Sequence, residues 1–174
     1  ALNDLPVRSS SRMRSKISTF ASTAMPIVSA MPAMPGKVST GRATAEPARP
    51  HDLRGALDLL GRTELTEQDV AERWGHYFVV REDDGRVVGV AGLEVHGEDG
   101  LLRSVAVDED YRGQELAASL VEAAMGRAKR LSLRAVYLLT TTARDYFARR
   151  GFADCSREEA PAGIRESWEY RSGC

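Results

Sequence analysis

Cysteine, histidine and long apolar runs are all scarce in this 174-residue chain. Its two cysteines, Cys155 and Cys174, form no CxxC pair, which excludes a disulfide scaffold and a cysteine-rich zinc site. The three histidines are scattered, so we expect no metal. The longest unbroken aliphatic and aromatic run, residues 135–139, is far too short to span a bilayer, so we expect no membrane partner. Two sparse thiols are typical of a reducing compartment, and we predict a cytoplasmic protein.

The composition is that of a globular domain. Hydrophobic residues make up 43% of the chain and charged residues 28%, which excludes a wholly disordered or fibrous protein. The length suits one α/β domain and is short for two. The net charge of −1 hides an uneven distribution, because residues 1–50 carry seven basic and two acidic residues while residues 51–174 are acidic. An acidic folded part gives no reason to expect a nucleic-acid partner.

Residues 1–37 differ in composition from the rest of the chain. They are rich in Ser, Met, Ala and Pro, and Pro26, Pro32 and Pro35 exclude one continuous helix. We predict a disordered or extraneous N-terminal extension here, followed by one domain over residues 38–174. Two functional alternatives stay open for the extension: an acid-poor organellar transit peptide, and a basic arm that touches nucleic acid.

Hydrophobic periodicity predicts an α+β fold for the domain. The expected order is β-α-α-β-β-β-α-β-α-β-β, which gives a three-layer arrangement: a single mixed, mostly antiparallel sheet with helices on both faces. The predicted strands cover residues 40–46, 76–81, 86–96, 101–107, 134–139, 152–155 and 166–171, and the predicted helices cover residues 53–60, a short stretch from residue 66, 114–130 and 142–150.

Residues 107–117 carry the strongest chemical signal. A buried strand runs into a short polar loop and then directly into a helix. Such a corner gathers unpaired backbone N–H groups at the positive end of a helix dipole, where they bind phosphate without a side-chain motif. The guanidinium of Arg112 adds a donor that stays charged. We therefore predict that the diphosphate of a ligand binds here.

The same loop has the spacing of a known family. The residues Arg112-Gly113-Gln114-Glu115-Leu116-Ala117 resemble the Arg/Gln-x-x-Gly-x-Gly/Ala loop of the GCN5-related N-acetyltransferases (GNAT), and residues 143–152 resemble the helix and Gly-Phe of that family. The resemblance extends over residues 40–174. More narrowly, residues 92–94, 101–104, 137–143 and 159–161 resemble the small arsenic-resistance N-acetyltransferases of the ArsN type.

The resemblance implies a function and a set of binding residues. It implies an N-acetyltransferase that moves acetyl from acetyl-CoA, without a metal, to a small amino-acid-like amine, possible acceptors including toxic analogues such as arsinothricin or phosphinothricin. We expect a monomer or homodimer. The acetyl-CoA contacts that it implies are the loop residues Arg112, Gly113, Gln114, Glu115, Leu116 and Ala117, the oxyanion-binding backbone of Val105, Ala106 and Val107, and Thr140 beside the pantetheine arm.

Two positions depart from the family pattern. Glu115 stands where the loop usually has glycine, and if the backbone there needs a positive φ, glutamate costs about 1–2 kcal/mol. Its carboxylate would also repel a diphosphate, unless it faces solvent as an ordinary helix-start residue. We therefore predict weaker acetyl-CoA binding than in a glycine-containing relative. Phe147 stands where many relatives have a tyrosine that protonates the leaving thiolate, a loss that a thiol with a pKa of about 8.5 tolerates.

Attack on a thioester requires a neutral amine, so a nearby carboxylate or histidine suffices as base. Glu94 lies between apolar neighbours in a predicted strand and is our candidate catalytic base or ammonium clamp, with His96 as a further candidate. The alternative for Glu94 is an outward-facing strand residue. Arg103 lies two residues before Val105, so strand alternation predicts one shared face and a bidentate clamp for a substrate carboxylate, phosphinate or arsinate. The alternative for Arg103 is a surface salt bridge.

Three further residues are candidates for the acceptor pocket. Thr141 follows a deep strand, at whose carboxyl end open sheets gather ligands, and ordinary helix capping is its alternative. Arg157 and Ser167 lie in segments that resemble the ArsN type, and plain solvation is their alternative. A second reading of the whole chain also stays open, because Glu115 and Phe147 are compatible with a catalytically degenerate binding or regulatory module.

Overall fold

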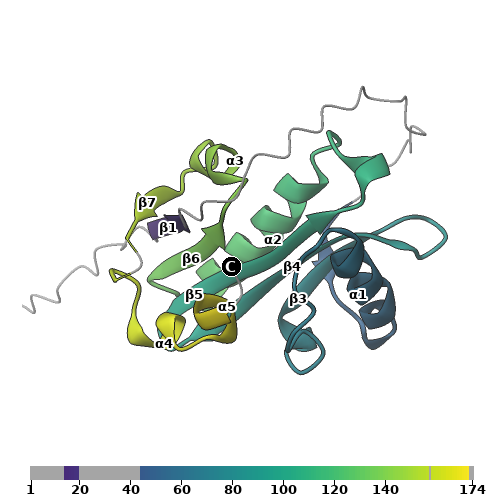
Figure 1. The fold of residues 1–174 in the computed structure, drawn as a ribbon. Coiled ribbons are helices and arrows are strands. Elements are labelled where there is room, and N and C mark those ends of the chain that lie inside the picture. Colours follow the sequence, from purple (N-terminus) through teal and green to yellow (C-terminus); the bar gives the residue numbers. More distant parts are fainter. Residues whose placement is uncertain (1–13, 20–43, 157, 173–174) are drawn as a thin grey trace, which may run out of the picture.

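The computed structural model describes residues 14–19, 44–156 and 158–172, and within them one sheet runs in the order β2-β3-β4-β5-β6-β1-β7 (Figure 1). The strands are β1 (Arg14–Thr19), β2 (Glu46–Pro47), β3 (Tyr77–Arg81), β4 (Val87–His96), β5 (Asp99–Val107), β6 (Ala135–Thr140) and β7 (Ala153–Cys155). The helices are α1 (Leu53–Arg62), α2 (Leu116–Arg130), α3 (Arg144–Ala148), α4 (Ala162–Arg165) and α5 (Trp168–Ser172), with 3-10 turns η1 (Pro50–Asp52), η2 (Trp74–His76) and η3 (Glu109–Tyr111).

The sheet is mixed. Antiparallel pairing joins β2, β3, β4 and β5, as the short turns between most of these strands require, and parallel pairing joins β5 to β6, β6 to β1 and β1 to β7. The predicted α+β class, with a single mixed and mostly antiparallel sheet, is confirmed.

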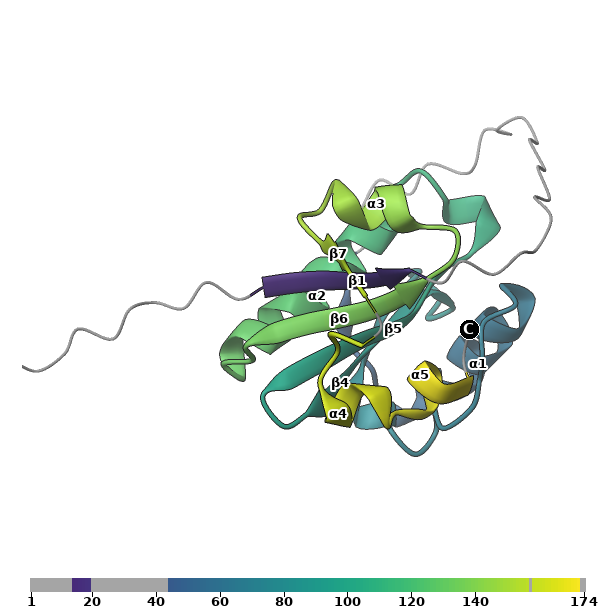
Figure 2. The same cartoon turned by 60° about the vertical axis from the view of Figure 1, so that its left-hand side comes forward.

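Helices cover both faces of the sheet because successive strand residues point to opposite sides. In β3, Phe78 and Val80 pack in the core under α2 and α3, while Tyr77 and Val79 pack against α1. Farther along the sheet, α4 and α5 lie on the same side as α1 and cover Leu101 of β5 together with β6 (Figure 2). The polar residues described below lie on the face of the sheet that α1, α4 and α5 cover.

One strand lies inside the stretch that composition predicts to be an extension. Residues 14–19 form β1, which pairs in parallel with β6 on one side and β7 on the other (Figure 2). These six residues belong to the sheet, a pairing that the predicted extension did not anticipate. The rest of residues 1–37 lies outside the described part of the chain, so the domain division there stays a prediction.

Two predicted elements have a different structure. Residues 166–171, predicted as a strand, belong largely to helix α5, because the Ser167 hydroxyl accepts a hydrogen bond from the backbone N–H of Tyr170 at 3.2 Å and caps the helix. The short helix expected from Thr66 is a series of turns. The Thr66 Oγ1 accepts a hydrogen bond from the N–H of Gln68 at 3.1 Å. Asp69 takes a φ of 57°, which interrupts a right-handed helix.

Candidate active site

Strands β5 and β6 separate toward their carboxyl ends. Their ladder runs only from Asp99 opposite Ala135 to Leu101 opposite Tyr137. The remainder of β5, up to Val107, therefore takes no part in pairing with β6. Parallel strands that separate at their carboxyl ends are where open sheets take ligands. All three predicted oxyanion-binding residues, Val105, Ala106 and Val107, lie in this separated part of β5.

A bulge in β5 changes which side chains share a face. Val90 pairs with Ala106 and Gly92 with Arg103, so two residues of β5 stand opposite one of β4, and Ser104 takes a φ of 53°. Val105 packs on the α2 side of the sheet, whereas Arg103 lies in a polar cluster on the other side. The prediction that alternation places Arg103 and Val105 on one face is therefore wrong, since the bulge interrupts the alternation.

The loop after β5 has the backbone conformation of a tight turn. Gly113 takes a φ of 82°, and Glu115, the residue before the first turn of α2, takes a φ of 60°. Glu115 thus adopts the conformation for which the family uses glycine, as its position in the loop suggested. The side chain of Arg112 is mostly exposed and lies 3.4 Å from Glu109. Together these residues turn the chain so that α2 begins immediately behind the end of β5.

The residues of α3 sit beside this corner. Phe147 is buried in the core against Phe152. Tyr146 packs at the edge of the same core, with the Arg150 guanidinium 3.7 Å from its ring centroid. Burial and the charge of Glu115 raise the pKa of Tyr146, against the opposing charge of Arg150.

The threonines that follow β6 have different environments. Thr140 is half-buried, and its Oγ1 accepts a hydrogen bond from the N–H of Ala143 at 2.9 Å, so it fixes the turn into α3. Thr141 is exposed. Arg157 lies outside the described residues. The binding roles of all three stay predictions.

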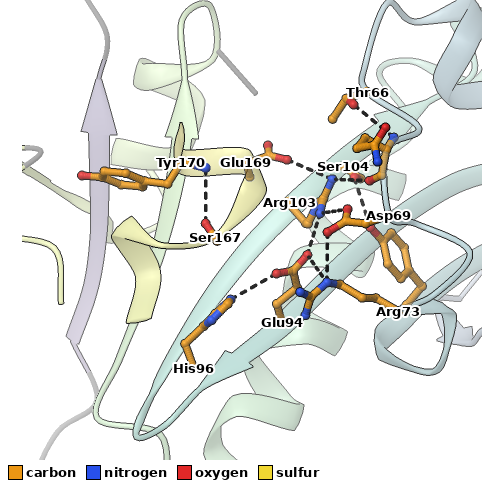
Figure 3. Close-up of polar contacts among 12 residues, drawn as sticks. Thr66, Asp69, Arg73, Glu94, His96, Arg103, Ser104, Ser167, Glu169 and Tyr170 are labelled. Atoms are coloured by element: carbon orange, nitrogen blue, oxygen red, sulfur yellow. Dashed lines mark hydrogen bonds and ion pairs between the residues drawn. The ribbon is translucent and has the colours of Figure 1, made fainter. Parts of the chain in front are cut away.

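A buried cluster surrounds the guanidinium of Arg103 (Figure 3). The Arg103 side chain is 0% exposed, and its Nη1 donates to Asp69 Oδ1 and to Glu94 Oε1, each at 2.6 Å. Its Nη2 donates to the carbonyl of Gln68 at 3.2 Å and lies 3.1 Å from Glu169 Oε2. The predicted clamp and the predicted base are thus joined in one ion pair, and the surface alternative for Arg103 is wrong because its side chain is fully enclosed.

Glu94 is held ionised within this cluster. Burial opposes its charge, but hydrogen bonds with His96, at 3.1 Å, and with Arg103 outweigh burial and lower the pKa of Glu94 to about 2. The side chain is 1% exposed, so the outward-facing alternative is wrong. A carboxylate with so low a pKa is a weak proton acceptor at neutral pH. The geometry gives Glu94 a positioning contact with Arg103, and its role as the base stays a prediction.

Sequence reasoning missed three members of the cluster, one of which is Arg73, whose Nε lies 3.0 Å from Asp69 Oδ2 and 3.7 Å from Glu94 Oε1. Asp69 falls in the predicted second helix, and Glu169 falls in the predicted final strand between the aromatic residues Trp168 and Tyr170. Helix α5 buries Glu169, and burial raises its pKa, with the nearby Glu94 and Asp69 adding to the rise and Arg103 opposing it. The sequence signal that could have identified Glu169 was its position as an acidic residue between two aromatic residues.

Metal-binding and membrane-spanning features were also sought in the described ranges. No group of three or more His, Cys, Asp or Glu side chains is arranged there to hold a metal ion. None of the helices in those ranges has the length and apolar character needed to cross a bilayer.

Comparison with known sequences identifies the family. The sequence profile of the Acetyltransferase (GNAT) family matches residues 46–152. An amino-acid acetyltransferase of Aeromonas salmonicida is 31% identical over 144 residues, covering 75% of this chain and 33% of that protein. An amino-acid acetyltransferase of Pseudomonas putida is 30% identical over 128 residues, covering 69% of this chain and 30% of that protein. This chain therefore spans about a third of the length of these curated relatives.

Solved structures share the fold. Rv2747 from Mycobacterium tuberculosis, in a complex that contains CoA, matches with a TM-score of 0.62 at 25% identity and covers 70% of this chain and 78% of its own. N-acetylglutamate synthase from Neisseria gonorrhoeae, complexed with CoA and N-acetyl-glutamate, matches with a TM-score of 0.66 at 18% identity and covers 75% and 33%. The family match includes the separated strands, the loop and α2. The chain therefore belongs to the GNAT acetyltransferase family.

Proposed function

We propose that this protein transfers the acetyl group of acetyl-CoA to the amino group of an amino acid. The observation that carries the proposal is the separation of β5 from β6 immediately before the corner into α2, where Gly113 and Glu115 take positive φ values. Backbone N–H groups at such a corner suit a diphosphate, and backbone groups of a separated strand suit a developing oxyanion.

The residues present fit acetyl-CoA, with one opposing charge. Residues 112–117 would hold the diphosphate, the backbone of residues 105–107 would polarise the thioester carbonyl, and Thr140 would contact the pantetheine arm. Bound acetyl-CoA supplies an activated acyl carbon and a thiolate leaving group. Glu115 places a carboxylate at the same loop, so we expect binding to be weaker than a glycine there would allow.

The acceptor is proposed to be an α-amino acid. The curated relatives bear the name amino-acid acetyltransferase, and Arg103 offers a guanidinium suited to a carboxylate. The segments that resemble the ArsN type extend the proposal to toxic analogues whose side chain ends in a phosphinate or arsinate, such as phosphinothricin or arsinothricin. The N–H groups of a guanidinium also donate to those oxyanions.

Product analysis tests the function. The chain is incubated with acetyl-CoA and pooled proteinogenic amino acids, then with phosphinothricin alone, and products are identified by mass spectrometry alongside free-thiol release. We expect a mass increase of one acetyl group on at least one amino acid, with stoichiometric CoA release. Release of CoA without an acetylated amine would indicate hydrolysis and contradict the proposal.

The second candidate function is a non-catalytic module with this fold. Two observations favour it: Glu115 opposes an anionic ligand, and Phe147 fills the core where many relatives have a tyrosine acid. Acetyl-CoA binding without turnover of any amine in the pooled assay would support this candidate over the enzyme.

A further inference from the structure

Two buried charged atoms of opposite kind lack hydrogen-bond partners side by side in the Arg103 cluster. Within the described part of the chain, Arg103 Nε, a donor, has no acceptor, and Glu169 Oε2, an acceptor, has no donor in hydrogen-bond geometry although Arg103 Nη2 lies 3.1 Å away (Figure 3). Leaving buried charged groups unsatisfied is costly, so such a pair is unusual in a structure that is complete without a ligand.

The chemistry of these two atoms specifies what would satisfy both. The N–H of Arg103 requires an acceptor with negative charge, and the oxygen of Glu169 requires a donor with positive charge. A free α-amino acid carries a carboxylate and an ammonium group on a single carbon. Bound between the two side chains, the amino acid would replace the Arg103–Glu169 ion pair with two ion pairs. Its carboxylate would pair with Arg103 and its ammonium group with Glu169, so no buried charge would lose its partner.

We propose that Glu169 binds the ammonium group of the amino-acid substrate and accepts its proton, while Arg103 Nε binds the substrate carboxylate. The proposal rests on the proposed acetyltransferase function and adds to it the residue that prepares the amine. It also restricts the substrate class to amines that carry an adjacent carboxylate.

Arg103 is held by more contacts than Glu169, so Glu169 is the side chain that moves when a substrate enters. Arg103 is fixed through Nη1 by Asp69 and Glu94, and through Nη2 by the Gln68 carbonyl. Among the residues that the structure describes, Glu169 pairs through its side chain with Arg103 alone, and it comes from the short helix α5. Because the Arg103 side chain is fully buried, substrate entry requires α5 to shift outward while the guanidinium stays in place.

The surroundings of Glu169 suit a proton acceptor. The charged and titratable groups that face it are Arg103 from β5, Glu94 from β4, Tyr77 from β3 and Asp69 from the preceding turns. Burial and the two other carboxylates raise the pKa of Glu169, whereas Glu94 has a pKa of about 2. Paired carboxylates whose environments separate their pKa values divide into a base and a permanently ionised partner.

The step balances in atoms and charge. The ammonium proton moves to a Glu169 oxygen, and the freed lone pair of the amine attacks the thioester carbonyl carbon. The C–N bond forms, the C–S bond breaks, and CoA departs as a thiolate. The attacking nitrogen then carries two protons, of which one neutralises the thiolate and the other stays in the amide. Glu169 releases the proton it accepted to solvent, so the products are an N-acetyl amino acid, CoA and one proton.

The test compares Glu169→Gln, Glu169→Asp and the control Glu166→Gln, an exposed neighbour on the same segment. Steady-state kinetics are measured from pH 5 to 9 with acetyl-CoA and the amino acid that the wild-type chain acetylates fastest, and also with its decarboxylated amine. We expect Glu169→Gln to lower kcat/KM roughly 100-fold and to remove the acidic limb of the pH profile. Glu169→Asp should keep that limb at a reduced rate, Glu166→Gln should match wild type, and the decarboxylated amine should be at least about tenfold poorer.

The outcomes distinguish a failure of the proposed acetyltransferase function from a failure of the role of Glu169. A wild-type chain that acetylates no amino acid contradicts the proposed function itself. An active wild type whose Glu169→Gln variant keeps its rate and its pH profile overturns the role of Glu169 alone. If Glu169→Gln fails to fold, a Glu169→Asp variant without the acidic limb also overturns it. Equal turnover of the decarboxylated amine overturns the role of Arg103 Nε.

Discussion

At Glu115 the backbone has a φ of 60°, a conformation that costs a non-glycine residue about 1–2 kcal/mol. The same residue brings a carboxylate to the corner proposed to bind a diphosphate. Only the charge acts against the liganded state, because binding adds repulsion, whereas the positive φ is already present without a ligand and lowers the stability of the fold instead. The residue is therefore a site where affinity can be gained.

Replacing Glu115 separates the two effects. Glu115→Gln removes the charge, and Glu115→Gly removes the charge and the strain. Isothermal titration should show acetyl-CoA binding several-fold tighter for both variants, and urea denaturation should show Glu115→Gly to be more stable than Glu115→Gln by about 1 kcal/mol. Unchanged or weaker affinity in both variants would mean that the carboxylate faces away from the ligand.

Glu94 links pH to stability at the residue scale. Its pKa falls from 4.5 to about 2 on folding, so its stabilising contribution is present above pH 4.5 and is lost as the pH falls toward 2. We expect Glu94→Gln to lower the free energy of unfolding by roughly 3 kcal/mol at pH 7 and by less at pH 3. Urea denaturation at both pH values checks this, with the exposed Glu122→Gln as control. Equal losses at both pH values would contradict it.

At the scale of elements, α5 depends on one serine. The Ser167 hydroxyl donates to the Ile164 carbonyl at 2.7 Å and accepts from the N–H of Tyr170, which joins α4 to α5 and positions Glu169 between them and β5. We expect Ser167→Ala to cost about 1 kcal/mol in thermal or urea unfolding and to lower kcat/KM for the amino acid. A variant with unchanged turnover would show that α5 needs no cap to present Glu169.

We expect the ionised Glu169 side chain to lower the free energy of unfolding, although it is the residue proposed to bind the substrate amine. Because its folded-state pKa is raised, folding is favoured below its ordinary pKa of 4.5, and that advantage is lost as the pH rises through the folded-state value. Glu169→Gln should therefore be more stable than wild type at pH 8 and closer to it at pH 4, measured by urea denaturation. A variant less stable than wild type at pH 8 would contradict this.

The elements that local pattern determines were predicted well. The helix α2 and strands β3 to β6 follow from apolar periodicity and turns, and the sequence placed them within a few residues. The failures lie where long-range contacts decide. Asp69 accepts a hydrogen bond from Arg103 and has a left-handed backbone conformation, which the predicted helix does not allow. Residues 166–171 were predicted as a strand, so the helix cap at Ser167 was missed. In the candidate site, Arg103 and Glu94 were identified singly, but their mutual contact depends on the register of the β4–β5 pair, in which Gly92 stands opposite Arg103 and Glu94 opposite Leu101.

At the scale of the whole molecule, β1 completes the sheet between β6 and β7. A chain that begins at residue 20 would leave the β1-facing edges of both strands unpaired. Hydrogen exchange should then show at least about tenfold faster exchange of amides in β6 and β7, while β3 and β4 keep their protection. Unchanged protection in β6 would show that β1 does not stabilise its neighbour.

The central claim is that acetyl-CoA binds where β5 separates from β6 and α2 begins. A crystal structure of the full chain with CoA tests this most directly. We expect the diphosphate on the backbone N–H groups of residues 113–116 and the thiol end beside residues 105–107. CoA bound elsewhere on the molecule, or a corner left empty at saturating CoA, would contradict the account.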